Sequence, residues 1–398
     1  MQKFDAIRPY SDEETSAVIQ RLVHDREFLN LIGRIKSPGA ARWAPAMLRG
    51  IVSYWLRRRF GGFTRIDDLQ ASLSGYVGEL VGNTTTRVTQ SGLQNLEQES
   101  THLFICNHRD IVFDPMIVNF LLYNQGLKTT RIAIGDNLLE NRVFAEMMRL
   151  NKSFVVRRSM TSPREIRDAY LMLSDFINHS IETHNGVWIA QREGRAKDGI
   201  DRTDPAIVKM LHMSPKKSGL DFQTAINRLK IVPVSIAYEF DPCDLDKANE
   251  LETRARTGAY LKAEGEDTRQ IMRGLTGFKG HVHVHFGAPI EDAEANPKAL
   301  AAQIDREIHS HYHLHPSNLV AHQLREAAAN KGPVEAGPPA SLAAAESCTR
   351  QALETAENEL QKRLNACKAA ARPYLLDMYA NPVTSGLNAV STADASTG

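Results

Sequence analysis

The sequence predicts an α/β fold, in which a largely parallel sheet is flanked by helices and joined to an N-terminal helical segment and a helical C-terminal extension. Two observations support this prediction. Between residues 88 and 292, short apolar runs alternate with stretches whose apolar residues recur at helical spacing, a pattern typical of parallel strands linked by helices. The 398 residues, 42% of them hydrophobic, are also enough to form one large core with additions.

Shifts in composition divide the chain into segments. Glycines and prolines mark a linker, and the last residues have the Ser, Thr, Ala and Gly content typical of disorder. We therefore predict, in order, a helical segment that faces a membrane (1–87), the α/β domain (88–292), a helical continuation (293–330), the linker (331–340), an alanine-rich C-terminal helix (341–382) and a disordered tail (383–398).

Short apolar runs between turn signals mark the strands of the sheet. The strands are expected at 102–106, 131–134, 153–157, 187–190, 231–237 and 281–286. The helices between them are expected at 115–124, 138–150 and 163–183.

Residues 42–60 have the pattern of an amphipathic helix that ends in three arginines, 57–59. Its apolar stripe consists of Leu48, Ile51, Val52 and Trp55. Such a helix can lie in a membrane interface with its arginines at anionic headgroups, or it can pack on the core with a solvated basic end. Because Arg59 falls on the apolar face, the pattern leaves both interpretations open.

Charge and cysteine content argue against several classes of protein. The formal net charge is +1, so no overall field favours nucleic acid as a partner. The four cysteines have no paired spacing, which argues against a disulfide framework or a zinc ribbon. No apolar stretch approaches the roughly 18 residues of a membrane span, and the first residues lack a signal-peptide pattern. We expect a cytoplasmic protein that is peripheral on the inner face of the membrane.

The most informative polar cluster is Asn107–Asp110, followed by Asp114. It comes directly after the strand expected at 102–106, and open α/β sheets bind their ligands at the carboxyl ends of the strands. His108 can accept a proton near neutral pH, and a nearby carboxylate can orient it. The alternative is a helix cap in which His108 is incidental.

A second polar cluster, Arg192–Lys197, follows the strand expected at 187–190. Parallel strands bring both clusters to the same edge of the sheet, so together they predict a base beside an anion-binding site. Gly194 would let the backbone approach a ligand closely or adopt a positive φ. Alone, a basic turn after a strand is often only solvated.

Four short sequence motifs occur in a characteristic order along the chain. They are Asn107-His108 with a downstream aspartate, Phe154-Val155-Val156-Arg157, Glu193-Gly194 with an arginine, and Ile231-Val232-Pro233-Val234-Ser235. This set resembles the glycerolipid acyltransferase family, which includes glycerol-3-phosphate and lysophosphatidate acyltransferases. The resemblance covers the chain from about residue 85 to about residue 290 and implies the α/β fold already expected.

The resemblance implies that His108 is the base for the acceptor hydroxyl and that an aspartate orients it. The family separates the two by four residues, whereas here that position holds Phe113 and Asp114 lies one residue further on. Asp110 is the other candidate for the orienting carboxylate. We favour Asp114, because Asp-Pro opens the next helical pattern as the family arrangement requires.

The other blocks imply substrate ligands. The planar donor fork of Arg157 matches phosphate oxygens, while Arg158 is interpreted as a surface residue. The third block departs from the family, because its arginine comes one position early and Arg192 stands where proline is usual. The acceptor-binding residues implied in this way are Arg157, Glu193, Gly194, Arg195 and Lys197. Pro233 is implied on the acyl-donor side.

Alternating histidines occur at two places. Those of 281–285 share one face of the last expected strand and could suit a metal ion, but a half-exposed strand explains them better, and no metal site is predicted. Those of 309–315 fall near an expected helix end, where imidazoles interact well with the helix dipole.

The resemblance implies an enzyme that moves a fatty acyl chain from acyl-CoA or acyl carrier protein to the free hydroxyl of 1-acyl-sn-glycerol-3-phosphate. The product is phosphatidic acid, attack is direct, and no cofactor is expected. Glycerol-3-phosphate or another lysolipid is an alternative acceptor. Two further interpretations stay open: a non-catalytic lipid-binding adaptor, favoured by the irregular spacing around His108 and Glu193, and hydrolysis of acyl thioesters.

Overall fold

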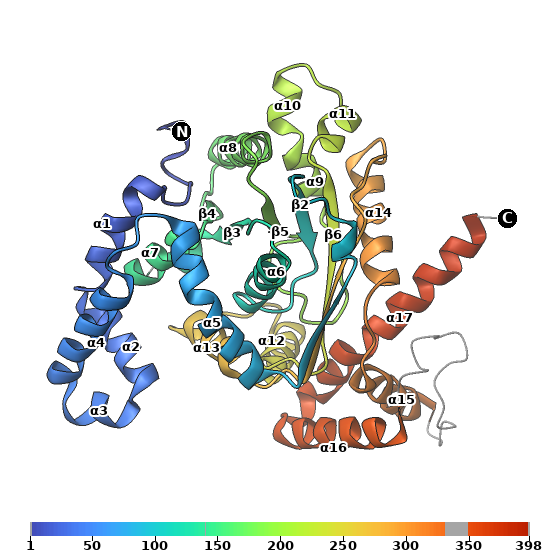
Figure 1. Cartoon of the computed structure of the whole chain (residues 1–398). Helices are drawn as coiled ribbons and strands as arrows, with labels where there is room; N and C mark the ends of the chain where they lie inside the picture. The colour runs from blue at the N-terminus through green and yellow to red at the C-terminus, as the bar shows by residue number, and fades with distance from the viewer. Residues whose placement is uncertain (1, 140, 331–348, 397–398) are drawn as a thin grey trace.

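A mostly parallel sheet forms the centre of the protein (Figure 1). The computed structural model describes residues 2–139, 141–330 and 349–396. The strands are β1 (Arg87–Ser91), β2 (Leu103–Cys106), β3 (Arg131–Gly135), β4 (Ser153–Val156), β5 (Val187–Ala190), β6 (Ile231–Tyr238) and β7 (His281–Phe286). Their order across the seven-stranded sheet is β1-β7-β6-β2-β5-β3-β4. The predicted fold class is confirmed.

The strands from β6 to β4 are all paired in parallel. β7 runs antiparallel to β6, and β1 runs parallel to β7. Each of the six predicted strands is found, and β1 is additional. Its sequence, Arg-Val-Thr-Gln-Ser, contains a single apolar residue, Val88, so periodicity could not reveal it as an edge strand.

β2 and β6 lie side by side in the middle of the sheet and are buried along their whole length. Burial on both faces explains why these runs are continuously apolar and do not alternate. Phe104 and Val232 pack in the core cluster on one face, and Leu103 and Ile231 in that on the other. The carboxyl end of β2 therefore emerges from a rigid centre.

Helices cover the two faces of the sheet (Figure 1). Those that follow β2 in the chain are α6 (Phe113–Asn124), α7 (Arg142–Leu150), α8 (Pro163–Glu182), α9 (Pro205–Leu211), α10 (Met213–Lys217), α11 (Phe222–Asn227), α12 (Asp244–Thr257) and α13 (Glu266–Thr276). The three predicted helices correspond to α6, α7 and α8. α8 begins with Pro163 in its first turn, and the Ser162 side chain accepts a hydrogen bond from the Glu165 N–H.

The first helices pack together on one side of the sheet (Figure 1). They are α1 (Asp12–Leu22), α2 (Arg26–Lys36), α3 (Pro38–Trp43), α4 (Pro45–Phe60) and α5 (Ile66–Thr84). α1 opens with the capping box formed by Ser11 and Glu14. In the described part of the chain, no helix has both the length and the apolar content needed to cross a membrane.

The apolar stripe predicted on residues 42–60 is divided between two environments. Val52 of α4 is buried in the core of the N-terminal helices, and Leu48 is half-buried against it. Ile51 and Trp55 are exposed. The helix therefore packs on the core, as one interpretation expects, while it leaves apolar side chains open to an interface, as the other expects.

The C-terminal extension differs from the prediction in two places. It contains α14 (Pro297–Ser310), α15 (Pro316–Asn330), α16 (Arg350–Ala366) and α17 (Arg372–Ser396). The single helix expected over 341–382 is interrupted at 367–371, and residues 383–396 continue α17, where disorder is predicted. Val383 is fully buried against Leu314 and Leu319, because tertiary packing stabilises a helix that composition alone does not favour. The predicted linker, 331–340, lies outside the described residues.

Candidate active site

His108 and Asp114 form a hydrogen-bonded pair beyond the carboxyl end of β2. Asp114 lies in the first turn of α6, and its Oδ2 accepts a hydrogen bond from His108 Nδ1 over 2.8 Å. The same oxygen accepts from the backbone N–H groups of Arg109 and Asp110, at 2.7 and 2.9 Å. Because an ionised carboxylate can only accept, His108 Nδ1 carries the proton, and Nε2 is left free to take one.

The turn at Asp110 accommodates the extra residue between His108 and Asp114. Asp110 Oδ1 accepts hydrogen bonds from the N–H groups of Val112 and Phe113, at 3.0 and 2.8 Å, and so caps the start of α6. Asp110 is buried, and this burial raises its pKa. The structure therefore places Asp114 against His108, as the favoured interpretation expects, and gives Asp110 a capping role.

Tyr238 at the end of β6 binds the second oxygen of Asp114. Its buried hydroxyl donates to Asp114 Oδ1, and burial together with the charge of Asp114 raises the pKa of Tyr238 well above its ordinary value. Both carboxylate oxygens thus have donors, which fixes the plane of the carboxylate and with it the ring of His108. No motif singled out Tyr238 in the sequence, since it reaches this site only through the register of the sheet.

The residues beside His108 anchor its turn to the sheet. Asn107 Nδ2 and Arg109 Nη2 both donate to Asp201 Oδ2, at 3.0 and 2.6 Å. Asn107 also exchanges two hydrogen bonds with the main chain of Ile236, at 2.7 and 3.0 Å. The Asn107 side chain thus extends the hydrogen-bonded ladder between β2 and β6 and holds the turn of His108 in place.

The second polar cluster, Arg192–Lys197, lies against the first. The N–H of Ala196 donates to the His108 carbonyl over 2.8 Å. Gly194 has a φ of 74°, and no atom lies within 4 Å of the position of a Cβ. The backbone conformation, and not crowding, is therefore what requires glycine here. The two clusters meet at one edge of the sheet, as their places in the sequence predict.

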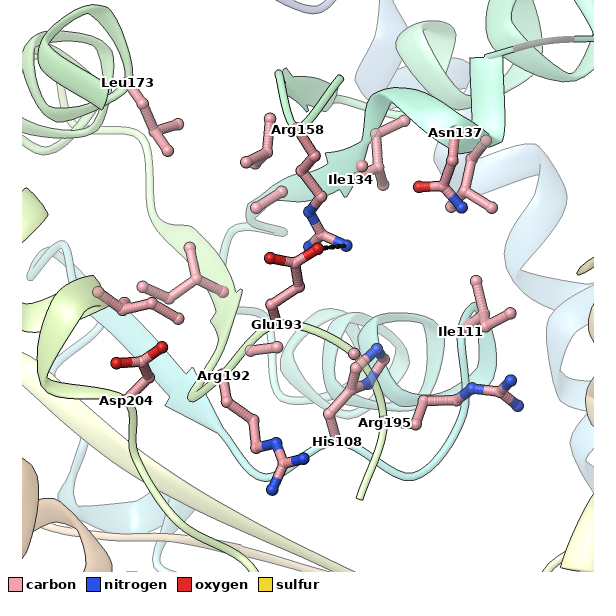
Figure 2. A pocket seen from close by; sticks show the side chains of 18 of the residues that line it. His108, Ile111, Ile134, Asn137, Arg158, Leu173, Arg192, Glu193, Arg195 and Asp204 are labelled. Carbon is pink, nitrogen blue, oxygen red and sulfur yellow. Dashed lines mark ion pairs between the residues drawn. The ribbon is translucent and has the colours of Figure 1, made fainter. Parts of the chain in front are cut away.

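A cavity of about 210 Å³ opens over His108. Figure 2 shows His108 beneath it, with Glu193 and Arg158 across the opening and Leu173 towards one end. That end is apolar and is formed by strands and by helices α8 and α9; its side chains include Ala133, Val156, Leu173, Ile177, Ile207 and Met210. The rest of the lining mixes polar and charged side chains with apolar ones, among them Ile111, Ile134 and Leu138.

Cations outnumber carboxylates in the polar part of the lining. The cations are Arg158, Arg192, Arg195, Lys197 and Lys262, and the carboxylates are Glu193, Asp204 and Asp267. Lys262 pairs with Asp267 over 2.6 Å, and Arg158 lies 3.7 Å from Glu193. Among the described residues, neither Arg192 nor Arg195 has a carboxylate within ion-pair distance. The cavity therefore offers positive charge to an anionic ligand.

Arg195 provides the clearest anion site. Its guanidinium is buried and donates through Nη2 to Gln270 of α13, while Nη1 has no hydrogen-bond partner among the described residues. A buried donor without an acceptor costs free energy, and a phosphate oxygen would satisfy it with a charge-assisted bond. Lys197 also lines the cavity but is paired with Glu250 of α12, and burial lowers its pKa.

Two arginines follow β4. Arg158 lines the cavity and Arg157 does not, so the structure differs from the prediction that Arg157 binds the acceptor phosphate. Arg157 is exposed and lies outside the lining, whereas Arg158 projects into the opening (Figure 2). The reason is the two-residue period of extended chain, which puts Arg158 on the same face as Val156. That alternation is the signal that could have identified Arg158.

One further predicted site residue lies outside the cavity lining, and two lining residues were not predicted. Pro233 is buried in β6 opposite Ile105 and lies outside the lining of this cavity, so its place on the acyl-donor side stays a prediction. Lys262 and Asp267 were not predicted, because they come from the loop before α13 and from α13 itself, far along the chain from every motif.

The chain also matches a known family. Residues 87–237 match the family model described as Acyltransferase. These residues are an acyltransferase domain, which confirms the resemblance to glycerolipid acyltransferases that the motifs indicate.

Among curated proteins, the chain is similar to the dihydroxyacetone phosphate acyltransferases of Bos taurus, with 25% identity over 248 residues, and of Homo sapiens, with 24% identity over 246 residues. Each match covers 60% of this chain but only 33% of the relative, so the similarity spans about a third of the length of these relatives. Among solved structures, the chain is similar to PlsC, a 1-acyl-sn-glycerophosphate acyltransferase from Thermotoga maritima. That comparison has 14% identity and a TM-score of 0.34, and it covers 71% of this chain and 95% of the other.

Proposed function

We propose that this protein transfers a fatty acyl chain from an acyl thioester to the free hydroxyl of a glycerol-phosphate acceptor, with His108 as general base. The observation that carries the proposal is the His108–Asp114 pair in the wall of a cavity lined by both apolar and cationic side chains. 1-Acyl-sn-glycerol-3-phosphate presents the same two characters, an apolar acyl group and a phosphate.

In the proposed reaction, His108 Nε2 takes the proton of the acceptor hydroxyl as the oxygen attacks the thioester carbonyl. The carbon–sulfur bond then breaks, and the protonated imidazole returns the proton to the departing thiolate. Asp114 keeps the proton on Nδ1 and stabilises the imidazolium, the part that the carboxylate plays in a Ser-His-Asp triad. The attack is direct, so no acyl-enzyme is formed.

The two parts of the cavity support this chemistry. The unpartnered Nη1 of Arg195 and the unpaired Arg192 can bind a phosphate at the cationic end. An acyl chain can lie against Leu173, Ile177 and Met210 at the apolar end. Holding both substrates beside His108 converts an encounter of two lipids into an effectively unimolecular step.

The expected acceptor is 1-acyl-sn-glycerol-3-phosphate, with phosphatidic acid as the product and acyl-CoA or acyl carrier protein as the donor. Dihydroxyacetone phosphate is a second candidate, favoured by the names of the curated relatives. Both acceptors carry a phosphate and a free primary or secondary hydroxyl within a three-carbon unit, so the same cationic end would serve either.

The test is acyl transfer from palmitoyl-CoA and from palmitoyl carrier protein to each acceptor, with glycerol-3-phosphate as a third. His108→Ala should lower kcat roughly a hundredfold or more, since a general base contributes about that factor. His24→Ala, which changes an exposed histidine of the N-terminal segment, is the matched control and should keep full activity.

Other outcomes would assign other functions. Equal rates in wild type and His108→Ala would remove His108 from the mechanism. Release of free fatty acid without acylated acceptor would indicate a thioesterase. The absence of any product with all donors and acceptors, together with retained binding to lipid vesicles, would indicate the adaptor.

We also propose that the protein is peripheral on the inner face of the membrane, bound through α3 and α4. Met47, Ile51 and Tyr54 recur at helical spacing on α4 and are 64, 56 and 60% exposed, and Trp43 at the end of α3 is 85% exposed. Exposed apolar side chains so close together mark an interaction surface, and the exposed arginines 57–59 suit anionic headgroups.

Co-sedimentation with vesicles tests the membrane proposal. Wild type should bind vesicles that contain phosphatidylglycerol and bind neutral phosphatidylcholine vesicles more weakly. The double variant Trp43→Ser/Ile51→Ser should lose this binding, while Leu261→Ser, which changes a side chain 91% exposed elsewhere on the surface, should keep it. Equal binding by both variants would contradict the proposal.

A further inference from the structure

A group of histidines lies at the β1–β7 edge of the sheet. It contains the histidines of β7 and those of the segment 311–315, which leads into α15. Val282 and Val284 of β7 pack in the same core cluster as Tyr238. Because side chains alternate along a strand, the histidines of β7 lie on the opposite face of the sheet, away from the hydroxyl that binds Asp114.

Three of these side chains form a compact triangle. The rings of His281, His313 and His315 have centroids 5.0, 4.9 and 4.7 Å apart. Each ring offers one nitrogen atom to a common site, and these three nitrogens all lie within 4.8 Å of one another. Three imidazoles around a common point are the ligand set of a divalent transition metal such as zinc, with a fourth position left for water.

His315 provides an independent observation. It is fully buried, and neither Nδ1 nor Nε2 has a hydrogen-bond partner of good geometry among the described residues, although the Ala237 backbone lies near enough to the ring to counteract the lowering of its pKa. Buried polar atoms are nearly always paired, and leaving one unpaired costs free energy. A metal ion bound to one of these nitrogens would satisfy that nitrogen and remove its share of the cost.

We propose that His281, His313 and His315 bind one divalent transition-metal ion of the zinc class, and that this ion fastens the 311–315 segment to strand β7. The site is separate from the catalytic pair and takes no part in the acyl transfer proposed above.

The surroundings of the triangle suit neutral imidazole ligands. Burial lowers the pKa of His281 to about 4 and lowers those of His313 and His315 as well. Thr89 Oγ1 lies 2.6 Å from His281 Nε2, a second-shell contact that would orient this ring if Nδ1 binds the metal.

Two charged side chains contact His281. Arg87 Nη2 donates to His281 Nδ1 over 3.2 Å; its guanidinium opposes a cation and must leave this nitrogen if the metal takes it. Arg87 is exposed, so its side chain can move into solvent. Glu239 Oε2 accepts a hydrogen bond from the backbone N–H of His281 over 2.8 Å and so holds the main chain of this ligand.

The experiment uses the full chain without a polyhistidine tag. Titration of metal-free protein with Zn²⁺ and with Co²⁺ should show one tight equivalent, Co²⁺ should give the visible absorption of a tetrahedral site, and Zn²⁺ should raise Tm. His313→Ala is the test variant, because His313 is only half-buried and its truncation leaves the core intact. It should weaken binding roughly a hundredfold or more, since even second-shell changes cost about 10- to 100-fold.

His311→Ala is the matched control. His311 belongs to the same segment but stacks on His285, outside the triangle, with ring centroids 4.1 Å apart. It should bind Zn²⁺ as wild type does, and all three proteins should show equal acyl transfer under saturating substrate. No tight equivalent in wild type, or equal weakening in His311→Ala and His313→Ala, would overturn the proposed site. Because activity is measured separately, failure of the metal site and failure of the acyltransferase proposal can be distinguished.

Discussion

At the scale of single residues, the hydrogen bonds of Asp114 determine what His108 can do. One carboxylate oxygen binds His108 Nδ1 and two backbone N–H groups, and the other binds the hydroxyl of Tyr238. With its position fixed in this way, the carboxylate keeps the imidazole in the tautomer whose Nε2 is free. The proposed chemistry therefore depends on buried partners as much as on the two residues that the motif contains.

Tyr238→Phe removes one of these partners and nothing else. Hydrogen bonds to a charged group are worth about 1.5–3 kcal/mol, so kcat should fall roughly tenfold or more. KM should stay unchanged, because Tyr238 lies outside the cavity lining. Steady-state kinetics measure kcat and KM separately and so test this expectation. Tyr123→Phe, on the exposed end of α6, serves as control, and a raised KM with unchanged kcat would contradict the positioning role.

The two aspartates of the catalytic turn should respond differently to the same change. Asp114→Asn removes the negative charge beside His108 and replaces one of the two accepting oxygens with a donating NH2 group, so kcat should fall roughly a hundredfold or more. Asp110→Asn keeps a side-chain oxygen that can cap α6 and should change kcat by less than about tenfold. Single-turnover acyl transfer measures both, and a larger loss from Asp110→Asn would assign the orienting role to that residue.

The stability of the protein should also report the burial of Asp110. Burial raises the pKa of this carboxyl, so the folded chain holds its proton more tightly than the unfolded chain does. Asp110 therefore contributes most to stability below its unfolded pKa, and this contribution is lost as pH rises through the folded pKa. The free energy of unfolding of Asp110→Asn, relative to wild type, should thus increase between about pH 4 and about pH 7. Urea unfolding at both pH values tests this, and an unchanged difference would argue against the raised pKa.

At the scale of elements, the turn Arg192–Lys197 brings the proposed anion site to the proposed base, His108. Its left-handed residue, Gly194, redirects the chain so that Ala196 reaches the His108 carbonyl and Arg195 enters the cavity. The helix α12 supports the neighbouring turn of His108, because Lys247 Nζ donates to the Arg109 carbonyl over 2.7 Å.

Gly194→Ala should therefore affect activity through the backbone. A Cβ at positive φ costs about 1–2 kcal/mol, and relief of that strain would shift Arg195. Gly219→Ala is the matched control, since Gly219 also has positive φ, 80°, and open space around it, but lies outside the cavity lining. Both variants should lose similar stability in thermal unfolding, and only Gly194→Ala should show a raised KM for the phosphate acceptor. A similar KM for the phosphate acceptor in both variants would contradict the proposed role of this turn in holding Arg195.

At the scale of the whole molecule, the C-terminal helices brace the catalytic domain. Arg363 of α16 pairs with Asp244 at the start of α12 over 2.6 Å, and the Tyr379 hydroxyl of α17 donates to the same carboxylate over 2.8 Å. These buried contacts hold α12 in place, and α12 in turn supports the turn of His108. The extension thus stabilises the active site from a distance.

Val383→Ala tests how much α17 contributes to the stability of the protein. Val383 is fully buried, so its truncation should cost about 1–3 kcal/mol of unfolding free energy. Acyl transfer below the unfolding transition should be unchanged. Thermal unfolding monitored by circular dichroism measures the loss, and Leu261→Ala, which alters an exposed side chain, should leave Tm as it is. Wild-type stability in Val383→Ala would mean that α17 does not anchor the fold.

The sequence by itself determined the parts of this protein that depend on local pattern. Continuous apolar runs predicted β2, β5 and β6, because strands buried on both faces need no polar side chains. Helical spacing predicted α6, α7 and α8. The polar residues that follow β2 and β5 predicted His108 and the basic turn as neighbours, since parallel strands end at one edge.

Only the tertiary structure decided the contacts between distant segments. It selected Asp114 over Asp110, brought Tyr238 to the carboxylate, put Arg158 in the cavity where Arg157 was expected, and gathered His281, His313 and His315. It also made a helix of the tail beyond Pro382, whose composition predicts disorder. Side-chain packing and register across the sheet set these contacts, and neither is encoded in the spacing of residues along the chain.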